Sequence, residues 1–339
     1  MLHKFREIMY KGLGLNKLRS EISREVSEVS RDVSEIKDLL TELKRTLQET
    51  NENAVNNLDG IFQRRLDEKL DFYFKWRLPL SFPENGKTLI HTNDGHRLYV
   101  DPKEPFITLH LLEHGEWETP IRREIRRELS AGSTFIDIGA NIGLHTLFAA
   151  ALVGETGRVY AVEPHPVTME MLRINLEING LLDRVDLGEV AVSNVDGGIV
   201  EFEYFAEHPA MSGIKVSPQV LAKFKGTLQK INVATTTLDA LVHSKGLKPD
   251  LVKIDVEGFE YSVLEGCVQT IEKFPSVRFL MEYEKAMAEA VMHTNIGEDI
   301  ADFFESKGFK VYKVESETLK SQTYMEFRHE LRGDYIFAR

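Results

Sequence analysis

A segment of alternating charges, Lys253-Ile-Asp255-Val-Glu257-Gly258, holds the first candidates for chemistry in this 339-residue sequence. Strand periodicity would place Lys253, Asp255 and Glu257 on one side of a strand over 251–256. Charges inside a sheet are costly unless they are paired, and a positioned carboxylate can take a proton from a reacting hydroxyl. We therefore predict Asp255 as the first candidate for a general base and Glu257 as the second. Lys253 would tune or neutralise Asp255; a buried ion pair with no catalytic part is the alternative.

A glycine-bearing turn, Asp137-Ile-Gly139-Ala-Asn141-Ile-Gly143, follows a short apolar run and precedes a predicted helix over 144–152. Glycines at the end of a strand let the backbone approach a ligand closely, and asparagine tolerates a left-handed backbone. A dinucleotide would bring its pyrophosphate to this turn, where the carboxylate of Asp137 would repel it. S-adenosylmethionine carries an ammonium and a sulfonium, so the aspartate favours this methyl donor as the cofactor. We predict Asp137, Gly139, Asn141 and Gly143 as cofactor-binding residues.

Further candidates lie where the following strands of the predicted sheet end. The next strand runs into Glu163, which would reach the ribose hydroxyls of an adenosine. The third strand leads into Ala191 and Val192, which could flank the adenine ring. Asp255 faces the same edge of the sheet, so we include it among the cofactor-binding residues as well as the catalytic ones. Glu282, after a later strand, is a third acid that could orient the acceptor or the donor.

These residues need a scaffold that brings strand ends together, and the pattern after Ser133 supplies one. Short apolar runs alternate with amphipathic segments, which is typical of an α/β fold with a doubly wound, mostly parallel, Rossmann-like sheet. The predicted strands are 135–138, 159–162, 185–190, 251–256, 277–281, 309–314 and 335–338. The stretch 196–247, with a strand over 199–205 and a helix over 238–243, is interpreted as an insertion on the substrate side. Upstream, 88–91 and 97–100 flank Asn93-Asp94-Gly95 and predict a hairpin.

The N-terminal part follows a different pattern. A heptad repeat over 22–47 keeps every seam position apolar among serines and charges, which predicts a coiled coil and a parallel homo-oligomer, dimer or trimer. An amphipathic helix folded back on its own domain is the alternative. The basic, amphipathic residues 1–19 could rest on an anionic membrane surface or simply lead into the coiled coil. The predicted division is 1–60 for the basic helix and coiled coil, 61–78 for a connecting helix and 79–339 for the catalytic domain.

Composition limits the partners and the compartment. The formal net charge of −12 argues against nucleic acid as a partner, because phosphate recognition normally needs a basic face. The single cysteine, Cys267, excludes an internal disulfide and a multi-cysteine zinc site, and fits a reducing compartment. Without a long apolar run or a secretory signal, we expect a cytoplasmic protein with at most peripheral contact at the inner face of a membrane. Asp255 and Glu257 could hold magnesium together with substrate oxygens, and metal dependence stays open.

Together, these motifs show that the chain resembles FkbM-type methyltransferases over residues 96–339. The resemblance rests on Trp117-Glu118, the turn 137–143, Val162-Glu163-Pro164, Ala191-Val192-Ser193, Thr236-Thr237-Leu238-Asp239, and the block 253–258 with Glu260 and Gly266 after it. Members of that family are similar in fold to class I methyltransferases and mostly modify hydroxyls of sugars, glycolipids, polyketides or related natural products. The resemblance therefore implies S-adenosylmethionine-dependent O-methylation of a small-molecule or glycan acceptor.

Two other interpretations follow from the same residues. A nicotinamide-dependent oxidoreductase could use the same sheet, but Asp137 and the lack of a Tyr-x-x-x-Lys run near the fourth strand count against it. A coiled-coil scaffold with a degenerate nucleotide-binding domain is the other. The four acids Asp137, Glu163, Asp255 and Glu257 disfavour it, because a degenerate site has no need to keep them.

Overall fold

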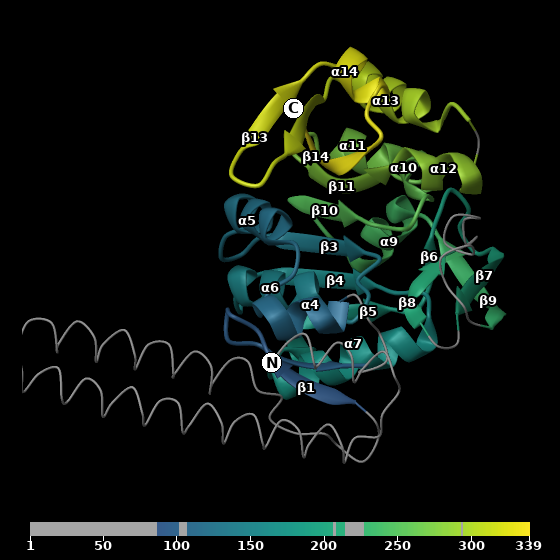
Figure 1. Ribbon diagram of the computed structural model, residues 1–339. Helices are drawn as coiled ribbons and strands as arrows, with labels where there is room; N and C mark the ends of the chain where they lie inside the picture. Colours follow the sequence, from purple (N-terminus) through teal and green to yellow (C-terminus); the bar gives the residue numbers. More distant parts are fainter. Residues whose placement is uncertain (1–86, 102–106, 206–207, 214–226, 293) are drawn as a thin grey trace, which may run out of the picture. The chain divides into compact units, whose positions relative to one another are not determined.

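The computed structural model describes residues 87–101, 107–205, 208–213, 227–292 and 294–339 (Figure 1). The predicted basic helix, coiled coil and connecting helix lie outside these residues. The chain divides into two compact units, Met1–Glu116 and Trp117–Arg339. Each unit is described by itself below.

The described part of the first unit is a hairpin and a helix. Strands β1 (Thr88–His91) and β2 (Arg97–Val100) pair in antiparallel fashion, and helix α4 covers Ile107–His114. The turn between the strands has Gly95 at φ 90°, and Asn93 Nδ2 donates a hydrogen bond to the carbonyl of His114 over 2.9 Å. The hairpin predicted around Asn93-Asp94-Gly95 is thus confirmed.

The second unit is built on an eight-stranded sheet in the order β13-β12-β14-β11-β10-β3-β4-β5 (Figure 1). The strands are β3 (Thr134–Ile138), β4 (Arg158–Val162), β5 (Val185–Gly188), β10 (Leu251–Ile254), β11 (Arg278–Glu284), β12 (Lys310–Val314), β13 (Leu319–Gln322) and β14 (Arg332–Ala338). Neighbours from β11 to β5 are parallel, whereas β14 runs antiparallel to both β11 and β12. The predicted doubly wound, mostly parallel sheet is confirmed.

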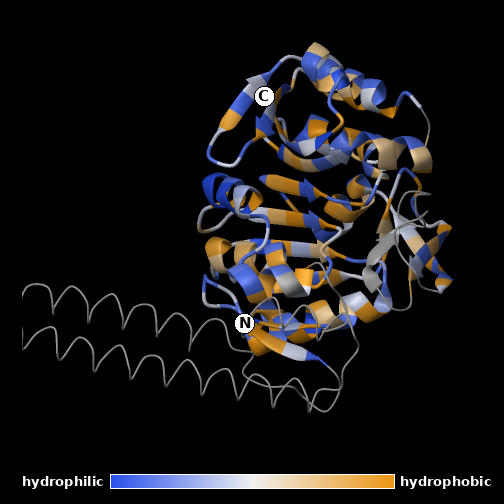
Figure 2. Ribbon diagram, viewed as in Figure 1, coloured by the Kyte–Doolittle hydropathy of each residue, from blue (hydrophilic) through white to orange (hydrophobic). Residues whose placement is uncertain are grey.

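Helices cover both faces of this sheet, which explains why every residue of β3 is buried. Helices α5 (Thr119–Glu128) and α6 (Leu144–Val153) lie on one face, where α6 packs on β3 and β4. The large hydrophobic core on the other face joins the sheet to α9 (Leu238–Lys245), α10 (Glu260–Glu265), α11 (Val268–Lys273), α13 (Ile296–Ser306) and α14 (Tyr324–Arg328). Figure 2 shows hydrophobic residues concentrated in the central strands.

The remaining elements connect these layers. Helix α7 (Pro166–Ile178) follows β4 and is capped by the side chain of His165; a short 3₁₀ turn, Leu182–Arg184, precedes β5. Helix α12 (Lys285–Val291) follows β11. Cys267 is fully buried just before α11, as expected for a small core residue. None of the described helices combines the length and the apolar character needed to cross a membrane.

The predicted insertion, together with the short strand Ala191–Val192 just before it, forms a second, four-stranded sheet in the order β6-β9-β7-β8. Its strands are β6 (Ala191–Val192), β7 (Ile199–Phe205), β8 (His208–Gly213) and β9 (Leu228–Thr236). Helix α9 then begins at a capping residue, Thr237, whose hydroxyl accepts a hydrogen bond from the backbone of Ala240. The insertion therefore returns the chain to the main sheet directly before β10.

Three strand boundaries differ from the sequence predictions, and all three affect candidate residues. Strand β10 ends at Ile254, so Asp255 and Glu257 lie in the loop after it and do not share a strand face with Lys253. Strand β11 runs to Glu284, so Glu282 lies inside a strand, not after one. The third strand ends at Gly188, and Ala191–Val192 is a separate short strand that pairs with β9. Apolar runs reveal where a strand is buried but not where its hydrogen bonding stops.

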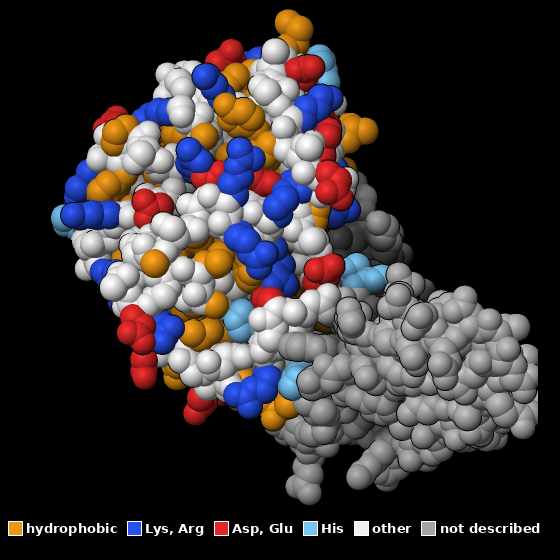
Figure 3. Space-filling view, turned by 90° about the vertical axis from the view of Figure 1, so that its left-hand side faces the viewer, with side chains coloured by type: hydrophobic (Ala, Val, Ile, Leu, Met, Phe, Trp, Pro, Cys, Tyr) orange, Lys and Arg blue, Asp and Glu red, His pale blue; other side chains and the backbone are white. Residues whose placement is uncertain are grey.

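A locally basic surface lies on this acidic protein. Helix α5 carries Arg122, Arg123, Arg126 and Arg127 and is mostly hydrophilic in Figure 2. Figure 3, which faces the side of the molecule where α5 lies, shows lysine and arginine side chains gathered there. Much of this charge is engaged within the fold. Arg122 and Arg126 stack over the ring of Phe148, and Arg123 donates to backbone carbonyls at Glu315 and Ser316.

Candidate active site

The glycine turn after β3 has the left-handed backbone that its sequence predicted. Gly139 and Asn141 adopt φ values of 81° and 50°, and the N–H groups of Gly139 and Ala140 both donate to the carbonyl of Val162 over 3.0 Å. A β-carbon at position 139 would lie 1.8 Å from the carbonyl oxygen of Asp255. Only glycine fits there, so the turn is held against the loop that follows β10.

Glu163 is fixed by the same turn. Its Oε2 accepts a hydrogen bond from the backbone N–H of Asn141 and its Oε1 from that of His165, each over 3.0 Å. Burial raises the pKa of Glu163 to about 7 despite these hydrogen bonds, and the charges of Asp137 and Asp255 add to the rise. The carboxyl of Glu163 is therefore protonated more readily than that of an exposed glutamate.

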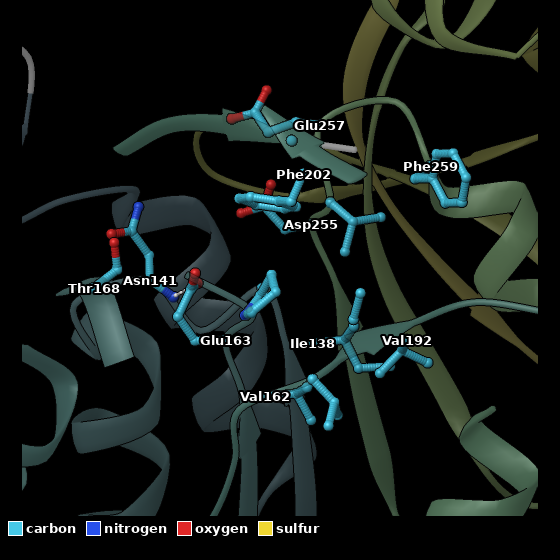
Figure 4. Close-up of a pocket in the computed structure, with 16 residues that line it drawn as sticks. Ile138, Asn141, Val162, Glu163, Thr168, Val192, Phe202, Asp255, Glu257 and Phe259 are labelled. Carbon is cyan, nitrogen blue, oxygen red and sulfur yellow. Dashed lines mark hydrogen bonds between the residues drawn. The ribbon is translucent and has the colours of Figure 1, made fainter. Parts of the chain in front are cut away.

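A pocket opens between the turn, β6, β7 and the loop after β10. Figure 4 shows the apolar side chains of Ile138, Val162 and Val192 on one side of it and the polar side chains of Asn141, Glu163 and Thr168 on another. The remaining lining residues are Gly139, Pro164, Val190, Ala191, Phe202, Gly213, Asp255, Val256, Glu257 and Phe259. A wall that is apolar on one side and acidic on the other suits a nucleoside.

The structure brings most of the predicted cofactor-binding residues to this pocket. Gly139, Asn141, Glu163, Ala191, Val192 and Asp255 line it. Asp137 and Gly143 do not: Asp137 is completely buried beside the turn, and Gly143 ends it, with a β-carbon there falling 2.4 Å from Leu172 Cδ1. Of the predicted catalytic residues, Asp255 and Glu257 line the pocket, whereas Lys253 and Glu282 lie outside its wall.

Lys253 links the glycine turn to the loop after β10. Its Nζ lies 2.8 Å from Asp255 Oδ2 and 3.7 Å from Asp137 Oδ1, and Asp137 Oδ2 accepts a hydrogen bond from Thr146 Oγ1 over 2.6 Å. Burial by itself would lower the pKa of Lys253, but the carboxylates of Asp255, Asp137 and Glu118 outweigh it and raise that pKa. The lysine is thus a permanent cation that holds Asp255 in place.

The loop from Asp255 to Phe259 has its own support. Glu257 and Gly258 both have positive φ, 55° and 97°, and Glu260 Oε1 accepts a hydrogen bond from the N–H of Gly258 over 3.0 Å. Burial raises the pKa of Glu260 to about 7, although the backbone hydrogen bonds oppose the rise. In the sequence, Glu260 stands out only as part of the motif that follows Gly258. Its hydrogen bond to the backbone of Gly258 could not be predicted from that motif.

Glu282 meets another acid across the sheet. It lies directly opposite Asp334 in the antiparallel β11–β14 pair, and its Oε1 is 3.2 Å from Arg332 Nη2. Burial, together with Asp255 and Asp334, raises the pKa of Glu282; burial and the charges of Glu118 and Asp255 raise the pKa of Asp334 to about 7. Glu282 therefore belongs to an acidic cluster next to the pocket instead of lining it.

Sequence reasoning missed two features of this region. Phe202, from the inserted sheet, lines the pocket and stacks near His165 at a centroid distance of 6.4 Å. Glu118 adopts φ 47° and its Oε2 lies 2.8 Å from His145 Nε2, which joins it to the first turn of α6. The motif Trp117-Glu118 was the only signal for the second contact, and nothing near His145 in the sequence points to it.

The block Thr236-Thr237-Leu238-Asp239, which is part of the family resemblance, stabilises the fold through Asp239. Asp239 accepts hydrogen bonds from the N–H groups of Gln269 and Thr270, over 3.0 and 2.7 Å, and so ties α9 to the start of α11.

With respect to metals, the described ranges contain no group of three or more His, Cys, Asp or Glu side chains placed to hold an ion.

Comparison with known proteins matches residues 137–311 to the methyltransferase FkbM domain. The chain is 29% identical over 205 residues to 31-O-demethyl-FK506 methyltransferase FkbM of Streptomyces tacrolimicus, covering 54% of this chain and 73% of that protein. It is 27% identical over 221 residues to methyltransferase sdnD of Sordaria araneosa, covering 58% and 81%. It is 26% identical over 195 residues to hexuronic acid methyltransferase AglP of Haloferax volcanii, covering 53% and 71%. The chain therefore belongs to the FkbM methyltransferase domain family and is an S-adenosylmethionine-dependent methyltransferase.

Proposed function

We propose that this protein transfers the methyl group of S-adenosylmethionine to a hydroxyl of a sugar, a glycan or a related natural product. The observation that carries the proposal is the meeting of the glycine turn, Glu163 and the Lys253–Asp255 pair around one pocket. The names of two relatives, a 31-O-demethyl-FK506 methyltransferase and a hexuronic acid methyltransferase, support an acceptor of this kind.

The walls of the pocket suggest how the donor is held. The apolar side chains of Ile138, Val162 and Val192 suit the adenine ring, and Ala191 lies beside them. Glu163 would accept hydrogen bonds from the ribose hydroxyls, since each of its oxygens has a second lone pair. Gly139 and Asn141 let the backbone come close to the nucleoside. Asp255, with Asp137 behind it, would face the positively charged end of the donor.

In this reaction an oxygen lone pair of the acceptor attacks the methyl carbon while the carbon–sulfur bond breaks and its electrons pass to sulfur. The hydroxyl proton must leave as the new bond forms, and a positioned base contributes about 10² to 10⁴ in rate. Asp255 is the first candidate for that base and Glu257 the second, because both residues line the pocket. Lys253 would position Asp255, and Glu282, in the acidic cluster next to the pocket, would help to orient the acceptor or the donor.

The rest of the prediction is the division of the chain, whose parts before residue 87 lie outside the described ranges. We propose that residues 79–339 form the catalytic domain and that 1–60 form an oligomerising coiled coil, joined to the domain by a helix over 61–78. Peripheral contact with an anionic membrane through residues 1–19 belongs to the same proposal. Sedimentation of the full chain and of a variant with polar seam residues in 22–47 tests the oligomer independently of catalysis.

Calorimetric titration of S-adenosylmethionine into wild-type protein and Asp137→Ala tests the donor site. We expect micromolar binding by the wild type, a loss in Asp137→Ala, and no change in Asp186→Ala, an exposed aspartate of β5. No binding by the wild type would overturn the donor assignment.

The acceptor class needs a second measurement. Donor with a labelled methyl group is incubated with neutral methyl glycosides, uronic acids and amines, and mass spectrometry locates the label. Label on oxygen in a sugar supports the proposal, whereas label only on nitrogen contradicts it. With the donor at saturating concentration, Asp255→Asn and Glu257→Gln then separate the two candidate bases, because only replacement of the true base should remove the fall in rate at low pH.

A further inference from the structure

The end of β11 and the start of β14 form the part of the sheet edge that lies beyond the loop carrying Asp255. The sheet order β3-β10-β11-β14 puts these two strands on the far side of that loop from the glycine turn (Figure 1). The proposed donor would extend from Glu163 to Asp255, both of which line the pocket (Figure 4). An acceptor hydroxyl must reach the methyl carbon from the side opposite to the sulfur, because the displacement is in line. We therefore expect the acceptor over β11 and β14.

The pairing of β11 with β14 gathers charged side chains on one face at this edge. Glu282 lies opposite Asp334, and Glu284 lies opposite Arg332. Residues two apart on a strand, and residues directly opposite in an antiparallel pair, point to the same face. Lys253 is paired with the residue two positions before Glu282, so it lies on this face too. The four charged residues of β11 and β14 are therefore on the side of the sheet that carries the lysine of the site.

Arg332 is the cation of this group that keeps hydrogen-bonding capacity for a ligand. Its side chain is 69% exposed; Nη2 lies 3.2 Å from Glu282 Oε1, and Nε lies 3.6 Å from Glu284 Oε2. Nη1, which carries two N–H groups, makes no hydrogen bond or ion pair within the described ranges. Burial and nearby carboxylates raise the pKa of Glu257 to about 8, and the charge of Arg332 opposes that rise. Arg332 thus acts on a residue that lines the pocket.

The acids around Arg332 would repel an anionic acceptor if every one of them were charged. Burial, together with neighbouring carboxylates, raises the pKa values of Glu282 and Asp334, so both are protonated more readily than exposed acids. The positive charge of Arg332 is then only partly compensated, and a protonated carboxyl can itself donate a hydrogen bond. A purely structural ion pair is the alternative, but pairs as exposed as these contribute little to stability.

The guanidinium group has a preferred kind of ligand. Its planar fork binds a carboxylate or a phosphate through parallel, charge-assisted hydrogen bonds. We propose that Arg332 binds an anionic group of the acceptor, a carboxylate or a phosphate, and so determines which acceptors are methylated. The inference rests on the proposed function and names the class of its acceptor: a hydroxyl compound, such as a sugar, that also carries an anionic group. Arg332 holds that group while the hydroxyl faces Asp255.

Two sugars that differ in one group test this assignment. In methyl β-D-glucuronide a carboxylate replaces the hydroxymethyl group of methyl β-D-glucoside, and D-glucose 6-phosphate supplies the phosphate. Ligand-observed NMR titrations measure the affinity of the three probes for the full chain saturated with S-adenosylhomocysteine. We expect at least one anionic probe to bind about tenfold or more tightly than the glucoside. Arg332→Gln should remove that preference and leave the affinity for the glucoside within about twofold.

A matched control and the affinity for S-adenosylhomocysteine separate this effect from a general loss of structure. Arg173→Gln replaces another exposed arginine, which pairs with Glu170 over 3.8 Å on α7, and should keep the preference. Calorimetry should show that Arg332→Gln binds S-adenosylhomocysteine within about twofold of the wild type. An equal loss for S-adenosylhomocysteine and for the anionic probe would overturn the specificity role.

The remaining outcomes distinguish the two proposals. A wild type that does not bind S-adenosylhomocysteine contradicts the proposed function itself. A wild type that binds S-adenosylhomocysteine but prefers neither anionic probe, or binds none of the three, overturns only the role of Arg332. The same conclusion follows if Arg332→Gln keeps the preference, or if it weakens the glucoside as much as the anionic probe.

Discussion

The carbonyl oxygen of Asp255 lies against Gly139 so closely that a β-carbon on residue 139 would be 1.8 Å from it. The N–H of Asp255 also donates to the carbonyl of Ile138 over 3.1 Å. The turn after β3 and the loop after β10 are therefore fastened to each other by backbone atoms. Each positions the other, and residues of both line the pocket.

This contact predicts unequal effects of alanine at two glycines with similar backbones. Gly139→Ala adds a clash with Asp255 to the strain of a positive φ, whereas Gly180 has φ 66° and no atom within 4 Å of the place a β-carbon would take. Gly180→Ala should lower the free energy of unfolding by about 1 kcal/mol. Gly139→Ala should lower it further and abolish donor binding. Urea denaturation and calorimetry measure both, and equal losses with donor binding intact would show that the contact does not shape the pocket.

The glycine turn and Glu163 could be predicted because their signals are local. A strand, a carboxylate, glycines and a helix follow one another within a few residues, and parallel strands bring their ends to one edge. The loop that holds Asp255 and Glu257 could not be predicted, because the alternating charges continue past Ile254, the last residue of the strand. The left-handed backbone at Glu257 was also invisible, since glutamate gives no sign of it.

Contacts between distant segments account for what else was missed. Glu118 meets His145 across 27 positions of sequence, and Glu282 meets Asp334 only because β14 enters the sheet between β11 and β12. No local periodicity encodes either pairing. Phe202 reaches the pocket because the insertion folds into a sheet of its own, and sequence patterns do not give the direction in which an insertion folds.

Lys253→Met should destabilise the protein and abolish methyl transfer. The lysine is 5% exposed between Asp137 and Asp255, so its removal leaves the buried Asp137 and the partly buried Asp255 without a cation and should lower the free energy of unfolding by roughly 3–5 kcal/mol. Lys285→Met, which breaks a partly exposed pair with Glu289, should change it by less than about 1 kcal/mol. Adding Asp255→Asn to Lys253→Met should restore part of the stability but no methyl transfer. A double variant no more stable than Lys253→Met would contradict the pairing.

Asp334→Asn should change how stability depends on pH. Because the pKa of Asp334 rises from 3.8 unfolded to about 7 folded, the folded protein keeps a proton that the unfolded chain releases between these values. Its contribution is therefore fully present below about pH 4 and is lost as pH rises through 7. The variant should be more stable than the wild type at pH 8, by roughly 2 kcal/mol, and equal to it near pH 4. Urea midpoints at both pH values measure this, with Asp186→Asn as the exposed control; a difference independent of pH would refute it.

Donor affinity should rise with pH through the ionisation of Glu163. Its pKa of about 7 lies above the ordinary 4.5 because the carboxyl is buried, so at pH 6 it is mostly neutral and at pH 8 mostly an anion. The anion is the better acceptor for ribose hydroxyls, because hydrogen bonds to a charged partner are about twice as strong. We therefore expect the affinity for S-adenosylhomocysteine to increase several-fold from pH 6 to pH 8. Glu163→Gln should bind more weakly and lose this dependence, since its amide does not titrate. Calorimetry with 5′-methylthioadenosine, which carries the ribose but no amino-acid group, should give the same slope, and a slope that survives in Glu163→Gln would assign the titration to another residue.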